Sequence, residues 1–323
     1  MNDLRFTVVV PTFRRPDLLQ RCLKALQGQT LPAEQYEVIV VDDGNDPDTA
    51  NLVRRNGQQP GLRMTYLGQP HRRGPAAARN RGWRTAQNPL IAFTDDDCIP
   101  QPDWLEAARK RFEAGASVVT GRVKMPLPNH PTAHDRTTAL LETAEFVTAN
   151  CFCRRTALEQ VGGFDEAFDI AWREDSALQF AFLQAGISVE PCPEAVLVHP
   201  LRLSSWYAPL RDERKNQYDA LLFKRYPDLF RERIPRYPAL VTTYYGIVGS
   251  ALLSLGGVTT GNKMLARFGG LSWALLTAGL VAHRQVNQSI KELPKNTLLA
   301  SVAPFLSVYW RLYGAIKHRV WYG

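Results

Sequence analysis

The first hundred residues alternate between short apolar runs and longer segments whose apolar positions recur at helical spacing. The apolar runs predict buried strands at 5–10, 36–41, 64–67 and 90–93. The helical spacing predicts helices at 16–26, 48–56 and 75–86, and the first and third of these begin at a proline. Strands and helices in strict alternation imply right-handed βαβ units. The pattern therefore predicts an α/β domain with a mainly parallel sheet and flanking helices.

Polar residues follow these strands directly. Thr12 follows the first strand, Asp42 and Asp43 follow the second, and three consecutive acids at 95–97 follow the fourth. The carboxyl ends of parallel strands meet at one edge of a sheet, where open α/β domains bind ligands. We therefore expect these side chains to line one crevice together with Arg79 from the helix at 75–86.

The three consecutive acids repel one another unless a cation lies between them. Hard divalent cations prefer carboxylate oxygens, so a metal site is one interpretation and an acidic turn in solvent is the other. The chain contains no G-x-G-x-x-G after its first strand and no G-x-x-x-x-G-K-[ST], which disfavours a dinucleotide-binding domain and a P-loop. Phosphates would instead be held by a metal on the acids and by Arg72, Arg73 and Arg79.

The last third of the chain has a different pattern. Residues 212–226 predict a charged helix, and 239–258 form an uncharged run of about twenty residues, long enough to cross a bilayer. A second apolar run at 268–282 is shorter. A third at 297–316 is interrupted by Pro304 and Arg311 and is rich in Trp and Tyr, which suits a membrane interface. The alternative is a bundle of buried helices in a soluble protein.

The charge is distributed unevenly along the chain. Residues 1–200 carry 22 Lys and Arg against 25 Asp and Glu, a net of −3, whereas residues 201–323 carry 17 against 6, a net of +11. A basic segment next to apolar runs favours an anionic membrane surface over nucleic acid. Arg231, Arg233 and Arg236 precede the first long run and predict that the N-terminal domain lies on the cytoplasmic face of the inner or plasma membrane. The five cysteines and the absence of a secretory signal predict reduced thiols in the cytosol.

Four motifs occur in order at the predicted strand ends and helix starts. They are Val-Val-Pro-Thr-Phe-Arg at 9–14, Val-Val-Asp-Asp-Gly at 40–44, Gly-Pro-Ala-Ala-Ala-Arg-Asn at 74–80 and Phe-Thr-Asp-Asp-Asp-Cys at 93–98. With them the chain resembles a bacterial-type, membrane-associated family 2 glycosyltransferase with the GT-A fold. The resemblance extends over residues 6–200. It implies strands at 117–121, 150–155 and 195–200, a glycine-rich turn at 161–166 and a helix that starts at Glu174 and Asp175.

The resemblance implies a divalent metal, Mn²⁺ or Mg²⁺, and a nucleotide-sugar donor that carries UDP. Asp95 and Asp97 would form the DXD pair, with Asp97 in direct contact with the metal, and Asp95 or Asp96 would lie near the ribose. His199 would complete the metal shell; its alternative role is structural, at the end of a strand. The metal would stabilise the negative charge that grows on the leaving diphosphate.

The resemblance also implies an acid–base residue and a nucleotide pocket. Asp175 would be the base that activates the acceptor hydroxyl, with Glu174 in support, and a single displacement would invert the anomeric carbon. A plainer interpretation is that both acids favour the dipole at a helix N-terminus. The nucleotide-sugar site would comprise Pro11, Thr12, Arg14, Asp42, Arg79, Asp95 and Asp96.

We therefore expect three regions: a nucleotide-sugar-binding and catalytic domain at 1–205, a charged helical linker at 206–238, and a transmembrane or interfacial region at 239–323. A membrane location favours a hydroxyl acceptor that is lipid-linked or a polysaccharide. Two other functions fit parts of the pattern: a sugar-phosphate nucleotidyltransferase, and a catalytically silent membrane-bound subunit that binds a sugar nucleotide. The first alternative normally opens with a glycine-rich loop, and this chain has Pro11 and Thr12 there instead.

Overall fold

The computed structural model describes residues 4–58, 61–129, 131–202, 205–235, 237–286 and 288–322, apart from the side chain of Ala133. Its contacts divide the chain into two compact units. Unit 1 runs to Leu201 without the segment Thr132–His134, and unit 2 comprises that segment and Arg202–Gly323. Arg236 lies outside the described residues. The finer division at 206–238 stays a prediction.

Unit 1 is built on one sheet of eight strands in the order β3-β2-β1-β4-β7-β6-β8-β5. The strands are β1 (Phe6–Thr12), β2 (Tyr36–Asp42), β3 (Arg63–Gly68), β4 (Leu90–Phe93), β5 (Ile99–Pro100), β6 (Val118–Lys124), β7 (Cys151–Arg154) and β8 (Val189–Val198). The first four are parallel to one another, as the alternating pattern predicts. Strand β7 is antiparallel to β4 and β6, and β5 is antiparallel to β8, so the sheet is mixed.

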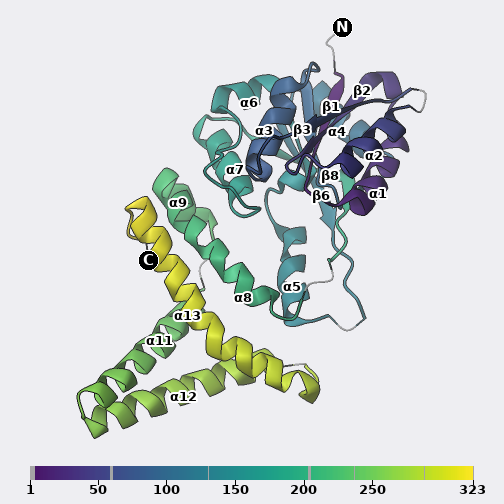
Figure 1. Ribbon diagram of the computed structural model, residues 1–323. Coiled ribbons are helices and arrows are strands. Elements are labelled where there is room, and N and C mark those ends of the chain that lie inside the picture. Colours follow the sequence, from purple (N-terminus) through teal and green to yellow (C-terminus); the bar gives the residue numbers. More distant parts are fainter. Residues whose placement is uncertain are drawn as a thin grey trace. The chain divides into compact units, whose positions relative to one another are not determined.

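Helices flank both faces of this sheet. Those of residues 1–201 are α1 (Pro16–Gln27), α2 (Pro47–Gly57), α3 (Pro75–Thr85), α4 (Trp104–Glu113), α5 (Ala133–Ala139), α6 (Arg155–Val161) and α7 (Glu174–Gln184). Residues of α1, α2 and α4 share one apolar core with the sheet, and residues of α3, α6 and α7 share another. Figure 1 shows α1 and α2 on one side of the sheet and α3, α6 and α7 on the other.

The alternation of strand side chains explains why two cores form. In β1, Phe6, Val8 and Val10 pack into the core of α1, α2 and α4, whereas Val9 packs into the core of α3, α6 and α7. All four side chains are 0% exposed. Successive residues of a strand point to opposite faces, so a continuous apolar run is what a strand covered on both faces requires. The predicted buried strand at 5–10 is confirmed.

Strands β6 and β8 are parallel with an irregularity between Gly121 and Arg122. The buried amide of Asn150 lies at this point: its Nδ2 donates to the carbonyl oxygens of Arg122 and Ala195, each at 3.0 Å, and its Oδ1 accepts from Nε1 of Trp104 at 2.7 Å. A Cβ on Gly121 would lie 2.4 Å from the Ala195 oxygen and from Oδ1 of Asn150. The amide therefore satisfies backbone groups that the irregular ladder leaves without strand partners.

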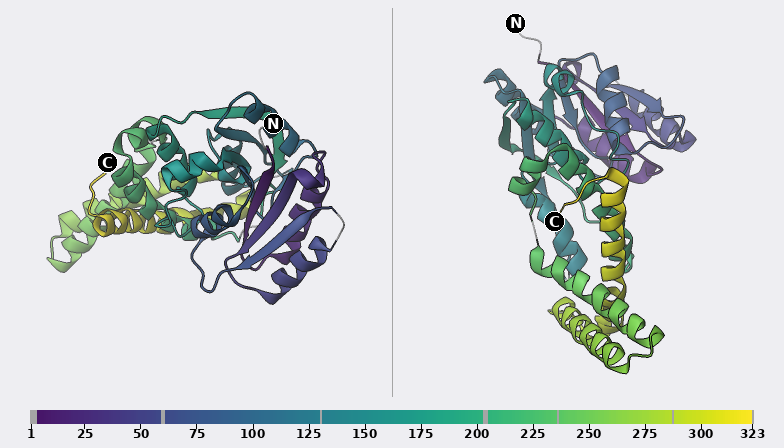
Figure 2. Two further views of the ribbon diagram at one scale, coloured as in Figure 1. Left: turned by 90° about the horizontal axis from the view of Figure 1, so that it is seen from above. Right: turned by 90° about the vertical axis from the view of Figure 1, so that its left-hand side faces the viewer.

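Unit 2 is helical. Its helices are α8 (Ala208–Asp212), α9 (Gln217–Arg225), α10 (Pro227–Arg233), α11 (Pro238–Thr259), α12 (Lys263–Gln285) and α13 (Leu293–His318). Tyr244, Ile247, Leu280, Ala300 and Val308 form a small apolar core among α11, α12 and α13. Figure 2 shows α11 and α12 joined by a short turn.

The structure changes several of the predicted boundaries. Helix α4 and strand β5 were not predicted, and β8 begins at Val189 instead of 195. The charged helix predicted at 212–226 is divided into α8, a 3₁₀ turn at Glu213–Asn216 and α9. Helix α12 is longer than the apolar run at 268–282 because it begins at Lys263, where the side chain of Asn262 accepts a hydrogen bond from the Leu265 N–H at 3.1 Å.

Candidate functional site

The acidic turn after β4 is fastened to the end of β1. Strands β1 and β4 are parallel neighbours, which brings Thr12 to the same edge of the sheet as the acids. The Thr12 hydroxyl donates to Oδ2 of Asp96 at 2.8 Å, and Nη1 of Arg15 lies 3.2 Å from Oδ1 of the same carboxylate. Burial raises the pKa of Asp96 to about 6, although Arg15 and the Thr12 bond oppose the shift. Thr12 and Asp96 therefore meet as predicted from the strand ends.

Arg79 connects this acidic turn to the start of α7. Its Nη2 lies 2.7 Å from Oδ1 of Asp95, and its Nη1 lies 3.3 Å from Oε1 of Glu174. The Arg79 side chain is 3% exposed and that of Glu174 is 6% exposed, so this ion pair is shielded from solvent. The predicted contact of Arg79 with a pyrophosphate stays a prediction, since in the structure this guanidinium pairs with two carboxylates.

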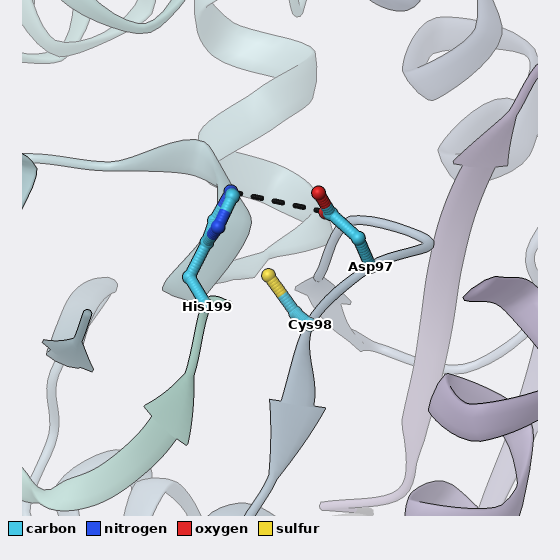
Figure 3. A group of neighbouring side chains, drawn as sticks. All are labelled: Asp97, Cys98 and His199. Atoms are coloured by element: carbon cyan, nitrogen blue, oxygen red, sulfur yellow. Dashed lines mark ion pairs between the residues drawn. The ribbon is translucent and has the colours of Figure 1, made fainter. Parts of the chain in front are cut away.

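Asp97, Cys98 and His199 form a group that fits a metal ion. One ligand atom from each residue lies within 4.8 Å of the others, and Oδ1 of Asp97 is 3.8 Å from Nε2 of His199 (Figure 3). The antiparallel pairing of Ile99 with Val198 places the residue after β8 beside the residues before β5. The carboxylate and imidazole suit Mn²⁺ and other transition metals, and the thiol adds a softer donor.

This group differs in one member from the predicted set. Asp97 and His199 are brought together as expected, and Cys98, which was interpreted only as a reduced thiol, is the third member. Cys98 is 0% exposed, and burial raises the pKa of its thiol well above the ordinary value. Asp95 instead pairs with Arg79 in the structure, and its role as a metal ligand stays a prediction.

Glu174 and Asp175 begin helix α7, after Arg173 in a left-handed conformation with φ of 70°. Burial, and next the neighbouring charge of Asp175, raise the pKa of Glu174 to about 7, while Arg79 opposes the shift. Burial also raises the pKa of Asp175, although its Oδ1 accepts a 2.7 Å bond from the Ser176 N–H. Two adjacent carboxyls with raised pKa values are suited to proton transfer near neutral pH.

Asp42 is fully buried and organises the turn after β2. Its Oδ1 accepts from the Gly44 N–H at 2.8 Å, and its Oδ2 accepts from the Asp46 N–H at 2.6 Å and from the Tyr66 hydroxyl at 2.9 Å. Both oxygens therefore have partners within the fold. The predicted place of Asp42 in the nucleotide-sugar site, where it would hydrogen-bond the edge of a pyrimidine base, stays a prediction.

Asp43 holds the loop between β3 and α3. Its carboxylate accepts from Nε2 of Gln69 at 3.0 Å, from the Arg73 N–H at 2.7 Å and from the Gly74 N–H at 2.8 Å. Gly74 has φ of 89°, and a Cβ there would lie 2.3 Å from the Asp169 carbonyl oxygen. Glycine is thus needed at position 74, immediately before α3, the helix that carries Arg79.

The aromatic ring of Phe13, in the turn after β1, has two guanidinium groups close to it. The guanidinium carbon of Arg72 is 4.5 Å from the ring centroid, and that of Arg14 is 5.4 Å from it. Arg14 has φ of 52°, in the left-handed region where a non-glycine residue is strained. Pro11 is buried within β1 beneath this turn. Of the predicted pocket residues, Pro11, Thr12 and Arg14 therefore stand next to a half-buried ring that the sequence did not single out.

A buried amide ties α3 to the glycine-rich turn before α7. The Nδ2 of Asn80 donates to the Phe164 carbonyl oxygen at 2.9 Å and to Oε1 of Glu166 at 2.8 Å, and its Oδ1 accepts from the Phe164 N–H at 2.9 Å. The Arg79 guanidinium lies 5.6 Å above the Phe164 ring. Asn80 thus fixes the backbone of Phe164, and Arg79 packs on the ring of that residue. The only sequence signal for it was its place in the third motif.

These strand ends and turns are also where the chain matches known proteins. A family model described as glycosyl transferase family 2 matches residues 7–164. The glycosyltransferase AglE of Haloferax volcanii is 29% identical over 210 residues, which is 61% of this chain and 67% of that protein. A pre-mycofactocin glycosyltransferase of Mycobacterium tuberculosis is 29% identical over 299 residues, which is 85% of this chain but only 57% of the relative.

A solved structure supports the architecture. A mannosyltransferase of Pyrobaculum calidifontis, PcManGT, in complex with GDP-Man and Mn²⁺, matches 98% of this chain and 87% of its own, with a TM-score of 0.55 and 20% identity. At this identity the likeness concerns the fold, which confirms the predicted GT-A-like α/β domain followed by a helical region.

Proposed function

The chain belongs to glycosyl transferase family 2, and we propose that it is a metal-dependent, inverting enzyme that moves a sugar from a nucleoside diphosphate donor to a hydroxyl acceptor. The observation that carries the mechanism is the double pairing of Arg79 with Asp95 and Glu174. It connects the acidic turn, where the diphosphate would bind, with the helix start that carries the base.

Asp97, His199 and Cys98 would hold a divalent metal, which supplies positive charge for the leaving diphosphate. The donor's nucleotide would lie along the turn after β1, near Pro11, Thr12 and Arg14. Its base would stack on the half-buried ring of Phe13. Asp96, fixed by Thr12 and Arg15, would accept a hydrogen bond from the ribose.

Asp175 would accept the proton of the acceptor hydroxyl. As that proton leaves, the hydroxyl oxygen forms a bond to the anomeric carbon, and the bond from that carbon to the diphosphate oxygen breaks. The electron pair departs with the nucleoside diphosphate. Because one displacement occurs, the anomeric configuration inverts. Glu174 would help to hold the guanidinium of Arg79 beside the acidic turn, and so position it instead of reacting itself.

The donor is expected to carry UDP, as the family resemblance implies, and the PcManGT complex makes GDP the other nucleotide to test. The acceptor is proposed to be lipid-linked or a polysaccharide at the cytoplasmic face of the membrane. Two helices of unit 2 support this location, since α11 and α12 are long and apolar enough to cross a bilayer.

Release of nucleoside diphosphate tests the proposal against both alternatives. The full chain is incubated with UDP- and GDP-sugars and Mn²⁺, with Asp175→Asn as the test variant and the exposed Glu159→Gln as the matched control. We expect release from one donor class that is reduced by about 10²–10⁴-fold in Asp175→Asn and unchanged in the control. Formation of a sugar nucleotide from a sugar phosphate would support a nucleotidyltransferase. Binding of a donor without any release would support a silent subunit.

A further inference from the structure

Helices α11 and α12 pack on each other through small residues. A Cβ on Gly257 would lie 2.3 Å from the backbone nitrogen of Ala266, and one on Gly269 would lie 2.4 Å from that of Ser254. The Ser254 hydroxyl donates to the Ala266 carbonyl oxygen at 2.9 Å. The two backbones are therefore in direct contact along this seam, a form of packing that is common between helices in membranes.

The outer surface of the same pair is made of large apolar side chains. Examples are Leu252, Leu255, Val258, Phe268, Leu271 and Leu275, each between 59% and 73% exposed, and Met264 at 80%. Only 11% of the most apolar stretch of α11 and 17% of that of α12 are buried. The core helix of a soluble protein would be mostly buried. Here Gly257, Gly269 and Ser254 lie at the contact between the two helices, and many of the large apolar residues lie outside, which is an arrangement that lipid favours.

The dimensions of the pair match a bilayer. Helices α11 and α12 have 22 and 23 residues. At 1.5 Å per residue each is about 33 Å long, against a hydrocarbon core of about 30 Å. Helix α11 contains no charged residue, and the charges of α12 are confined to its two ends, at Lys263, Arg267 and Arg284. Each helix is thus long enough to cross completely.

The charged residues at the two ends of the α11–α12 hairpin indicate whether it crosses the bilayer completely or enters it only partway. The turn between the helices is followed by Lys263 and Arg267, and Figure 1 shows this turn at the end of the α11–α12 pair that points away from α9. A hairpin that dipped only partway would place both cations in hydrocarbon, at high cost. A hairpin that crosses places them in the opposite interface.

The other end of the hairpin carries more positive charge. Arg231 and Arg233 precede α11, and Arg284, Lys291 and Lys295 follow the apolar part of α12. Loops with the larger number of Lys and Arg stay in the cytoplasm. At the same end, Nη2 of Arg284 donates to the Tyr244 hydroxyl at 3.2 Å, and Tyr237 is 60% exposed. Tyrosines of this kind are typical of a membrane interface.

We propose that α11 and α12 cross a lipid bilayer as one tightly packed hairpin. The turn at 260–262 then lies on the side of the membrane opposite to the residues that precede α11, and the chain after α12 returns to the side of those residues. The inference rests on the membrane location in the proposed function and adds the mode of insertion.

Cysteine labelling tests this topology. Little labelling of the native thiols is expected, because all five native cysteines are buried and lie in unit 1. Thr260→Cys places a thiol in the turn, and Ser289→Cys places one at the other end. The full chain is labelled with a membrane-impermeant maleimide in right-side-out and inside-out vesicles. We expect Thr260→Cys to react only in right-side-out vesicles and Ser289→Cys only in inside-out vesicles. Thr259→Cys replaces the turn variant if Thr260→Cys does not accumulate.

Two labelling patterns would overturn the inference. Reaction of both variants from the cytoplasmic side would mean that the hairpin lies flat on one leaflet. Protection of the turn from both sides until detergent is added would mean that the hairpin dips and returns. Complete extraction of the protein from the membranes by alkaline carbonate would instead refute the membrane location itself. Nucleoside diphosphate release by the same preparation shows separately whether the catalytic part of the proposed function holds.

Discussion

Nη1 of Arg79 lies 3.3 Å from Oε1 of Glu174, in a buried ion pair that joins two helices across 95 residues of sequence. Helix α3 supplies the cation, and the first residue of α7 supplies the acid. Because Arg79 also contacts Asp95, a change at any of the three residues should affect both the acidic turn and the proposed base.

Removing the cation is expected to destabilise unit 1. Arg79→Met leaves Glu174 buried without its partner, and loss of one member of a buried pair costs about 3–5 kcal/mol. Arg79 lowers the pKa of Glu174, so its removal raises that pKa further. The carboxyl then stays protonated at low pH and must be buried charged, or drive unfolding, at high pH. Urea denaturation should therefore show a larger loss at about pH 8 than at about pH 5.

The double variant Arg79→Met/Glu174→Gln serves as the control for this prediction. It removes the stranded charge and should recover part of the lost stability, with little dependence on pH above 5. If the single variant lost the same free energy of unfolding at both pH values, the Arg79 guanidinium would have no effect on the pKa of the Glu174 carboxyl.

The rate of sugar transfer is expected to fall on acidification, beginning above the ordinary pKa of an aspartate, because burial raises the pKa of Asp175. A general base works only when deprotonated, and burial raises the pKa of Asp175 and that of Glu174, the latter to about 7. Because adjacent carboxyls titrate as a pair, Glu174→Gln removes a neighbouring negative charge and should move the acidic limb to lower pH. The measurement is kcat against pH for wild type, Glu174→Gln and the control Glu159→Gln. An unmoved limb in Glu174→Gln would separate the two acids functionally.

The thiol in the metal group predicts a difference between hard and soft ions. Cys98→Ser should weaken binding of Co²⁺ and Zn²⁺ and remove the near-ultraviolet sulfur-to-cobalt absorption, while Mn²⁺ affinity changes little. Asp97→Ala should weaken all three ions by tenfold or more, about 1.4 kcal/mol, because it removes the carboxylate of the group. Calorimetry and the Co²⁺ spectrum measure both effects. A Co²⁺ spectrum that is identical in Cys98→Ser would show that the sulfur is not a ligand.

Two adjacent glycines provide a matched pair for the turn before α7. Gly162 and Gly163 both have φ of 79°, but a Cβ on Gly162 meets no atom within 4 Å, whereas one on Gly163 lies 2.6 Å from Oδ1 of Asn80. Gly162→Ala should cost about 1 kcal/mol through its backbone alone. Gly163→Ala should cost about 1–3 kcal/mol more, because the Asn80 amide must move. It should also lower kcat, since Asn80 holds the turn on which Arg79 packs.

Urea denaturation of both alanine variants checks these values. Equal losses would mean that the close approach to Asn80 relaxes without cost, and the amide would then not be a rigid support for Arg79.

Local patterns explain how much of unit 1 was predictable. The strands at 5–10, 36–41, 64–67 and 90–93 appear as β1 to β4 because a strand covered on both faces must be continuously apolar, and this is visible in any short window of sequence. The same reasoning placed Thr12 and the acids at 95–97 on one edge of the sheet, and the bond from Thr12 to Asp96 confirms that proximity. Helix α4 was missed although its apolar residues Trp104, Leu105, Ala108 and Phe112 recur at helical spacing, and strand β5 was missed because two residues leave no periodic signal.

The sequence by itself determined the α/β class, the parallel order of the first four strands and the concentration of carboxylates at their ends, because each depends on residues that are close in the chain. Only the tertiary structure decided that Arg79 pairs with Glu174, that Asn80 clamps the turn at Phe164, and that Cys98 joins Asp97 and His199. Each of these contacts joins segments of the chain that lie more than 80 positions apart, and the place of His199 depends on the antiparallel pairing of β5 with β8, which no local pattern specifies. In unit 2, likewise, hydropathy marked the apolar runs, but only packing showed that Gly257 and Gly269 lie at the contact between α11 and α12, while many large apolar residues of these helices stay exposed.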